Sequence, residues 1–201
     1  LTGAVTSGGT YTIISATSVT GTFAGQANNS FLYIGGEKFQ IQYTATAVNL
    51  VHQPGFTTST STVYVNNNWS STAFESDPDG GGSLPAATTK FGANAFAGIQ
   101  AAIDALPAAG GIVVIQGNTS GTDYSAPIVV NKPVTFQFAA DSANGAETSV
   151  FISGPLTLTS TVAFANASGP LTNAAGVTFS GTIDGGQNVD LSSLSIPVTI
   201  S

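Results

Sequence analysis

Carboxylate side chains gather at one place in the sequence, the segment ESDPDG at residues 75–80. Glu75, Asp77 and Asp79 are separated there by single residues, and a glycine follows them. Oxygen ligands in such an alternation could hold Ca²⁺, a hard cation that takes six to eight oxygens. The twelve-residue EF-hand pattern is not met. Two interpretations therefore stand: a calcium site formed by these three carboxylates, and a solvated acidic loop without a metal.

The other titratable residues are too scattered to predict catalysis. Glycoside hydrolases need paired carboxylates, whereas Asp184 and Asp190 stand apart, each beside turn residues. An aspartate in a turn commonly accepts hydrogen bonds from its own backbone. The single histidine, His52, and the absence of cysteine argue against a catalytic triad and against thiol chemistry. We therefore predict no catalytic residues, no cofactor other than Ca²⁺, and a protein that is not an enzyme.

Charge is scarce along the whole chain. Only 6% of the 201 residues are charged, the net charge is −7, and the three cations are all lysines. A chain without a basic patch is not expected to bind nucleic acid or an anionic membrane surface. No apolar run approaches the roughly 20 residues that a membrane-inserted helix needs. Solubility must then come from hydroxyl and amide side chains, which suits an extracellular protein of a bacterial cell surface.

A Pro-Gly pair followed by a Ser/Thr run divides the chain at residues 54–62, a composition typical of a linker. Before it, the runs at 31–34 and 38–44 alternate apolar and polar residues on either side of Gly35-Gly36, which predicts a β-hairpin. The predicted parts are a strand and hairpin module at 1–53, a linker at 54–62, and a larger module at 63–201.

The larger module combines one helix with repeated short strands. Apolar residues at helical spacing predict a helix over residues 94–106. After it, tripeptides of the form apolar-Thr-apolar recur at intervals of 22, 21 and 21 residues. Such a period predicts an all-β fold, a parallel β-helix with about 21 residues per rung and the helix as its N-terminal cap. The tripeptides begin at Val134, Leu156, Val177 and Val198.

Residues 63–117 resemble the entry into pectin-lyase-like right-handed β-helices. The runs VYVNNNW, SDPDGGG and AFAGIQAAIDALPAAGGIVVIQG carry the resemblance, which extends over roughly residues 63–201. It implies a right-handed β-helix that begins with the cap helix. Family members include polysaccharide lyases and hydrolases, phage tailspikes, and large bacterial adhesins or autotransporter-like surface proteins. The front run GTFAGQANNSFLYIGGEKFQIQYT is similar to a hairpin element of very long bacterial surface proteins.

We therefore expect a structural extracellular protein that forms part of a cell-surface layer, a fibre or an adhesin stalk. The strand pattern at residues 197–201 has no cap sequence after it, so we expect head-to-tail self-association through that end of the β-helix. A carbohydrate-binding adhesin module that contacts surface glycans is the alternative; Trp69 could stack on a sugar or pack over the junction between the modules. A polysaccharide lyase or hydrolase ranks third. The resemblance implies an arginine or lysine base beside carboxylates, but the chain has no arginine, and no carboxylate cluster lies beside Lys132.

Overall fold

The computed structural model divides the chain into two compact units, unit 1 at Leu1–Thr58 and unit 2 at Ser59–Ser201. β4 (Ala47–Thr57) and β5 (Thr62–Val65) lie on either side of the boundary, so strand occupies the first residues of the predicted linker. The side chains of residues 33, 54–57 and 190 are outside the description. The structure describes residues 6, 8–34, 37–57, 61–73, 75–80, 82, 84, 89–118, 123–141, 148–169, 171–187 and 189–200.

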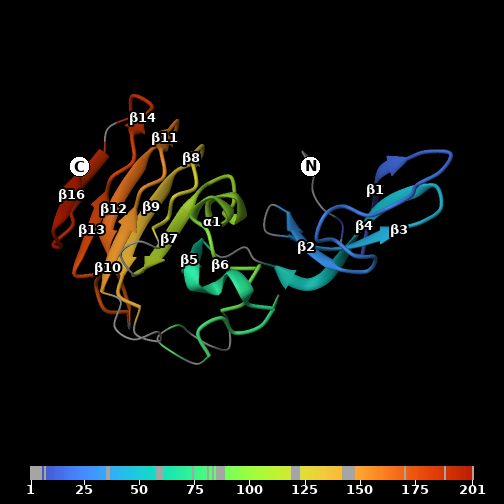
Figure 1. The fold of residues 1–201 in the computed structure, drawn as a ribbon, viewed down its shortest axis with the longest axis horizontal. Coiled ribbons are helices and arrows are strands. Elements are labelled where there is room, and N and C mark those ends of the chain that lie inside the picture. Colours follow the sequence, from blue (N-terminus) through green and yellow to red (C-terminus); the bar gives the residue numbers. More distant parts are fainter. Residues whose placement is uncertain are drawn as a thin grey trace. The chain divides into compact units, whose positions relative to one another are not determined.

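Unit 1 is a four-stranded antiparallel sheet with the strand order β1-β4-β3-β2 (Figure 1). Alternation along the strands gives the sheet one apolar face. Phe39 and Ile41 on β3 are buried there, as are Val48 and Leu50 on β4. β2 pairs with β3, and the predicted Gly35-Gly36 turn between them lies outside the described residues. In this sheet β1 covers Thr10–Ser15, β2 covers Phe31–Ile34 and β3 covers Glu37–Tyr43.

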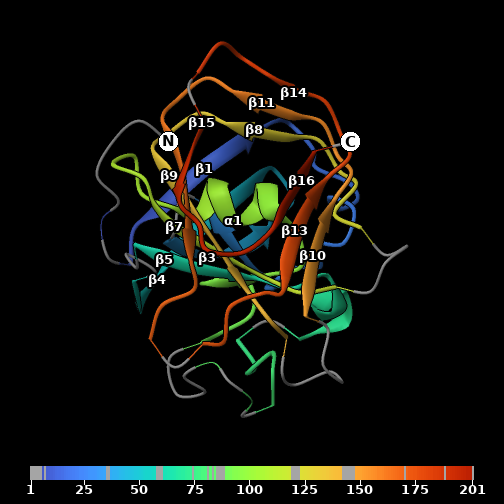
Figure 2. The ribbon, with the colours of Figure 1, turned by 90° about the vertical axis from the view of Figure 1, so that its left-hand side faces the viewer.

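Unit 2 contains three parallel sheets, with strand orders β15-β12-β9-β7-β5-β6, β14-β11-β8 and β10-β13-β16. Figure 2 shows α1 with these sheets on three sides of it. Buried residues from all three sheets and from α1 form one hydrophobic cluster. The elements are η1 (Asn67–Ser71), β6 (Ala95–Phe96), α1 (Ile99–Ala105), β7 (Gly111–Gln116), β8 (Ile128–Val130), β9 (Val134–Ala139), β10 (Ser149–Ile152), β11 (Leu156–Leu158), β12 (Val162–Asn166), β13 (Gly176–Phe179), β14 (Ile183–Asp184), β15 (Val189–Ser193) and β16 (Val198–Ile200).

The fold is rich in strands, but the predicted single right-handed parallel β-helix is wrong. The described strands form separate sheets of four, six, three and three strands instead. The tripeptides that begin at Val134 and Leu156 lie on β9 and β11, in different sheets, and those at Val177 and Val198 pair with each other on β13 and β16. Similar tripeptides recur because a strand in any of the sheets needs alternating side chains to present one apolar face. The pattern therefore marks the strands without assigning them to a sheet.

In unit 2, Val177 on β13 pairs with Val198 on β16, 21 positions later, but the other neighbouring strands are further apart in the sequence than the predicted repeat of about 21 residues. Val134 on β9 pairs with Val162 on β12, and Val162 pairs with Val189 on β15, steps of 28 and 27 positions. Ile128, Leu156 and Ile183 have the same two steps along β8, β11 and β14. The steps are long because, between β9 and β12 or between β12 and β15, the chain contributes one strand to each of the other two sheets.

The α-helix is shorter than the predicted range 94–106. It begins after Gly98, whose backbone is extended (φ −130°, ψ 146°), and covers Ile99–Ala105. The two residues of β6, which precede it, pair in parallel with β5. The side chain of Phe96 therefore reaches the core from a strand. The helix contacts β5, β6, β7 and β8, and its buried residues are Ile99, Ala102 and Ile103.

Four phenylalanine rings form the centre of the core. The rings of Phe138 and Phe164 are stacked, with centroids 5.8 Å apart and planes 11° apart. Phe164 also lies 5.6 Å from Phe136 and 5.7 Å, edge to face, from Phe179. Aromatic pairs at such distances stabilise a core beyond the area that they bury. Phe164, on β12, thereby joins the six-stranded sheet to β13 of a three-stranded sheet.

Replacing Phe164→Ala is expected to lower the free energy of unfolding of unit 2 by about 3–5 kcal/mol, because it removes a buried ring and leaves a cavity among the other three. Urea unfolding followed by the fluorescence of Trp69, the single tryptophan, reports on unit 2. Phe23→Ala is the control, since Phe23 is exposed in unit 1 and should leave this transition unchanged. A loss for Phe164→Ala below about 1 kcal/mol would contradict this description of the core.

Candidate functional site

The acidic loop that was predicted from the sequence is built on hydrogen bonds to the backbone. The Glu75 N–H donates to the Phe91 carbonyl at 2.9 Å. Asp77 Oδ1 accepts from the Asp79 N–H at 3.3 Å, and Asp79 Oδ2 accepts from the Leu84 N–H at 2.8 Å. Two of the three carboxylates therefore act as acceptors that fix the turn, a common use of aspartate.

The structure does not bring Glu75, Asp77 and Asp79 together as a cluster of carboxylates. In the part of the chain that the structure describes, no group of three or more Asp, Glu, His or Cys side chains could hold a metal ion. Calcium also binds backbone and amide oxygens, so calcium at this loop stays a prediction.

The two scattered aspartates lie on strands at the outer edges of their sheets. Asp184 ends β14, and its Oδ1 accepts from the Gly185 N–H at 2.7 Å. This bond fixes the turn that follows the strand. Asp190 lies on β15, in another sheet, and its side chain is outside the described part of the structure.

Lys132 and His52 also serve local structure. Lys132 Nζ donates to the Leu106 carbonyl at 2.8 Å, just beyond the last residue of α1. A cation at this end interacts favourably with the unpaired carbonyls of the helix. His52 Nε2 lies 2.9 Å from Glu37 Oε2 within unit 1.

Trp69 is buried inside unit 2. It packs with Leu84 and Ala95, and Tyr64 and Phe91 lie against the same cluster. Its ring therefore presents no exposed face on which a sugar could stack.

Tyr64, which lies against this cluster, has a perturbed side chain. Burial raises the pKa of the Tyr64 phenol above its ordinary value, so this group stays neutral at physiological pH.

A buried polar cluster lies where strands of the six-stranded sheet end, and the sequence analysis missed it. Asn66 follows β5, Gln116 ends β7, and Asp141 follows β9; all three are at most 1% exposed. Asn66 Nδ2 lies 2.7 Å from Asp141 Oδ2 and 3.2 Å from Gln116 Oε1. Its Oδ1 also accepts from the Asn68 N–H and so caps η1. The signal in the sequence was a carboxamide or carboxylate within two residues of the end of each of three apolar strands.

These bonds make the cluster a structural element that joins three strands. A buried carboxylate is costly unless it is hydrogen-bonded, and Asn66 supplies such a bond to Asp141. The side chain of Asn66 thereby links β5 to the ends of β7 and β9, at the same end of the sheet.

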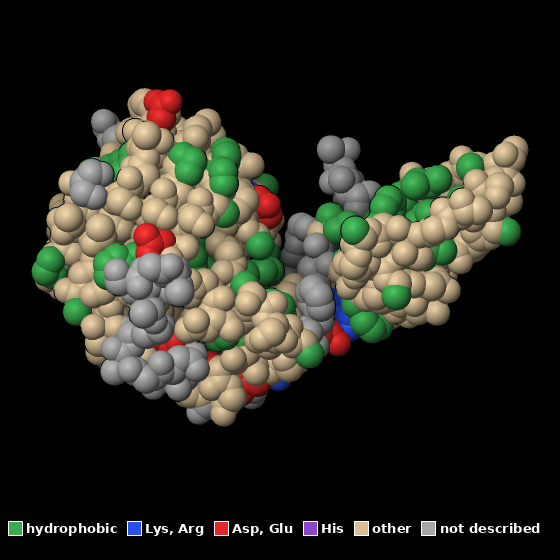
Figure 3. Space-filling view, in the orientation of Figure 1, with side chains coloured by type: hydrophobic (Ala, Val, Ile, Leu, Met, Phe, Trp, Pro, Cys, Tyr) green, Lys and Arg blue, Asp and Glu red, His purple; other side chains and the backbone are tan. Residues whose placement is uncertain are grey.

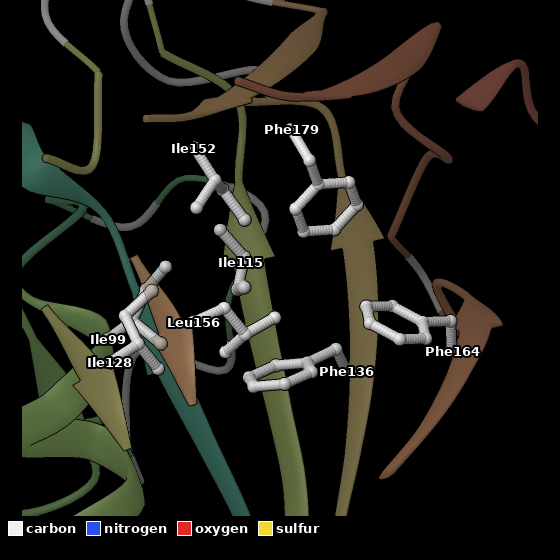
Figure 4. A pocket seen from close by; sticks show the side chains of 8 residues that line it. All are labelled: Ile99, Ile115, Ile128, Phe136, Ile152, Leu156, Phe164 and Phe179. Atoms are coloured by element: carbon white, nitrogen blue, oxygen red, sulfur yellow. The ribbon is translucent and has the colours of Figure 1, made fainter. Parts of the chain in front are cut away.

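The described residues of unit 2 line at least two cavities. The first, of about 10 Å³, is lined entirely by apolar side chains of the core, among them Ile99, Phe136 and Phe164 (Figure 4). It is a packing void, because a cavity of that size holds at most one water and this one offers water no polar partner. The second, of about 250 Å³, lies beside the start of α1 and is lined by Gln100, Asp123 and other residues. Its lining mixes polar side chains with apolar ones such as Ile99 and Ile128.

Side-chain amides close one edge of each three-stranded sheet. At the edge strand β8, Gln100 Oε1 accepts from the Val129 N–H at 2.6 Å, and Gln100 Nε2 donates to the Val129 carbonyl at 3.4 Å. At the edge strand β10, Asn118 Oδ1 accepts from the Phe151 N–H at 2.8 Å, and Asn118 Nδ2 lies 3.4 Å from the Phe151 carbonyl. At β8 the carboxamide takes the place that the peptide group of another strand would occupy. At β10 it acts beside the backbone of Tyr124, whose N–H donates to the Phe151 carbonyl at 3.0 Å. These amides satisfy edge groups that are otherwise open to pairing.

The opposite edges of the three sheets end in exposed aliphatic residues. Ile183 is 37% exposed, although it continues the column of buried Ile128 and Leu156. Val189 on β15 is likewise 37% exposed, and Ile200 on β16, which pairs with buried Phe179, is 65% exposed. Among the described residues, no strand pairs with the outer edges of β14, β15 and β16. We call these three edges the outer edge surface.

The surroundings of this surface carry little charge. Figure 3 shows that most of the visible surface of unit 2 has neither charged nor hydrophobic side chains. β14 and β15 each contain one aspartate, and β16 contains no charged residue. Natural edge strands are commonly protected by charged residues, so β16 is the least protected of the three.

Comparison of the chain with protein-family models, with curated proteins and with solved structures found no match in any of the three. No helix among the described residues is long and apolar enough to cross a membrane.

Replacing Gln100→Ala is expected to lower the free energy of unfolding of unit 2 by about 1 kcal/mol, because the Val129 peptide group loses both side-chain hydrogen bonds. Trp69 fluorescence in urea measures this change. Asp104→Ala is the matched control, since it removes the Gln100–Asp104 bond and leaves β8 untouched. Equal losses for the two variants would show that the amide does not stabilise the edge.

Proposed function

We propose that this chain is a structural extracellular module of a bacterial cell-surface layer, a fibre or an adhesin stalk, and that it self-associates by strand pairing at the outer edge surface. One observation carries the proposal: apolar columns in all three sheets of unit 2 run from buried residues to exposed Ile183, Val189 and Ile200. Exposed aliphatic residues beside open strand edges favour the addition of another strand, which buries the side chains and pairs the backbone.

The energetics favour β16 as the first point of contact. Fully burying an isoleucine stabilises a contact by about 1.5–3 kcal/mol relative to leaving it exposed, and Ile200 has the largest exposed fraction of the three residues. Its strand has no charge that would have to be desolvated. Partly buried Leu191, Leu194, Ile196 and Val198 lie against the same core and extend the apolar surface around it.

A surface with few charges supports the same proposal. Identical copies that stack bring like side chains close together, and like charges directly opposite each other on paired strands are destabilising. Hydroxyl and amide side chains avoid this repulsion. Low charge therefore suits a protein whose role is assembly.

Sedimentation velocity of the intact chain over a range of concentrations tests the proposal. The weight-average sedimentation coefficient of the unmodified chain is expected to rise with concentration. Ile200→Lys should keep the protein monomeric, because lysine places a charge in the apolar contact. Val129→Lys is the matched control: Val129 is also exposed, but it lies on β8, whose edge Gln100 closes, so this variant should associate normally.

A chain that stays monomeric at every concentration would overturn the proposal. Association that survives Ile200→Lys would also overturn it, since the contact would then lie elsewhere.

A further inference from the structure

The larger cavity, beside the start of α1, is lined by three parts of the chain that all belong to unit 2. Residues 97–101 lead into and begin α1, residues 123–126 and Ile128 lead into and begin β8, and Asn67 begins η1. The cavity volume of about 250 Å³ lies just below the range of about 300–1,000 Å³ that is usual for pockets that take drug-sized ligands. The space therefore suits a molecule with a single ring.

The floor of this cavity is apolar, and polar side chains lie toward its rim. Ile99, Tyr124 and Ile128 form the floor and are 2%, 6% and 3% exposed. Ser125 is exposed at the rim, and Asp123 is half-buried beside it. A purely apolar ligand would take water away from the Asp123 carboxylate and return no hydrogen bond, which is unfavourable. The lining therefore favours a ligand that has an apolar face and hydrogen-bond donors around its edge.

The charge of the lining limits the ligand further. Asp123 is the single charged side chain among the described residues that line the cavity, so an anionic ligand would find a like charge there and no cation. A carboxylate has about four acceptor sites, and it can therefore accept from ligand hydroxyls in addition to its contacts within the protein. The Asn67 carboxamide and the Ser125 hydroxyl add further donors and acceptors. These groups match a neutral ring that carries several hydroxyls.

Hydrogen bonds within the protein hold the walls of the cavity in place. Tyr124 Oη donates to the Gln116 carbonyl at 3.1 Å, and the Tyr124 N–H donates to the Phe151 carbonyl at 3.0 Å. Gln100 bonds the N–H and the carbonyl of Val129, the residue after Ile128. Walls that are already ordered lose little conformational entropy when a ligand binds.

Gly98 leaves part of this space open. Its backbone is extended (φ −130°, ψ 146°), a conformation that any residue adopts. A Cβ at this position would have no atom of the described residues within 4 Å, apart from its neighbours in the chain. A larger side chain at position 98 would therefore occupy the cavity without displacing its walls.

We propose that this cavity binds one neutral sugar ring, either as a free monosaccharide or as the terminal residue of a glycan. The C–H face of the ring packs on Ile99, Tyr124 and Ile128, and ring hydroxyls donate to the Asp123 carboxylate. An apolar pocket with a few placed polar groups is the usual form of a small-molecule site. The proposal adds a ligand-binding function to the structural role and does not depend on self-association, because no residue of the outer edge surface lines the cavity.

NMR titration of the full chain with D-glucose, D-galactose and D-mannose tests the proposal. At least one sugar is expected to shift the backbone amide signals of Gly98, Ser125 and Ile128 and to leave those of unit 1 in place. Gly98→Leu should abolish these shifts by filling the cavity, with a urea midpoint no lower than that of the unmodified chain. Asp123→Ala should weaken binding about tenfold or more, the usual loss for a hydrogen bond to a charged group. Asp184→Ala is the matched control, since it removes a carboxylate outside the cavity and should bind normally.

Methyl glycosides of the sugar that binds distinguish the two sources of the ligand. If a methyl glycoside of either anomer shifts the same amides, the site accepts a sugar attached to a glycan. If only the free sugar shifts them, the ligand is a free monosaccharide.

Three results would overturn the proposal. The first is the absence of shifts with all three sugars. The second is sugar binding that Gly98→Leu leaves unchanged, because the site would then lie elsewhere. The third is equal binding of D-glucuronate or cyclohexanol, because the cavity would then not select a neutral ring with several hydroxyls. These results leave the sedimentation of the chain untouched, so a failure here is distinct from a failure of the proposed self-association.

Discussion

Unit 2 depends on one constraint: its apolar side chains are covered by the strand beside them in the sheet, and that strand comes from a distant part of the sequence. Val134, Val162 and Val189 form one such column, with steps of 28 and 27 positions between paired residues. Each strand is short, and β8, β11 and β16 have three residues each. No single strand can bury its own apolar face, so burial requires a neighbour in the same register. Among the described residues, no strand pairs with the outer edges of β14, β15 and β16.

The protein treats its two kinds of sheet edge differently. Near the first strands, Gln100 and Asn118 supply peptide-like groups to β8 and β10, and α1 packs over the core. Asn66 ties three strand ends of the six-stranded sheet together through buried polar bonds. At the outer edge surface the columns instead end in exposed Ile183, Val189 and Ile200. The proposed function rests on this asymmetry between the two kinds of edge.

The strands themselves could be predicted from the sequence, because their alternation is local. All four apolar-Thr-apolar tripeptides lie in strands, on β9, β11, β13 and β16. Their stacking could not be predicted, because Val134 and Leu156 carry the same local pattern yet belong to different sheets. The helix lost its expected first residues for a similar reason: Phe96 fits a helical stripe, but pairing with β5 places it in a strand. The buried hydrogen bond between Asn66 and Asp141 could not be predicted either, because the two residues are 75 positions apart in the sequence.

Amide hydrogen exchange measured at several protein concentrations tests the proposed strand pairing at the outer edge surface most directly, because it reports on each backbone N–H separately. We predict that exchange of the β16 amides slows as the concentration rises, because a partner strand covers them. The amides of Val129 and Phe151 should exchange at the same rate at every concentration, since Gln100 and Asn118 already bond them. Exchange at β16 that does not change with concentration would contradict the account.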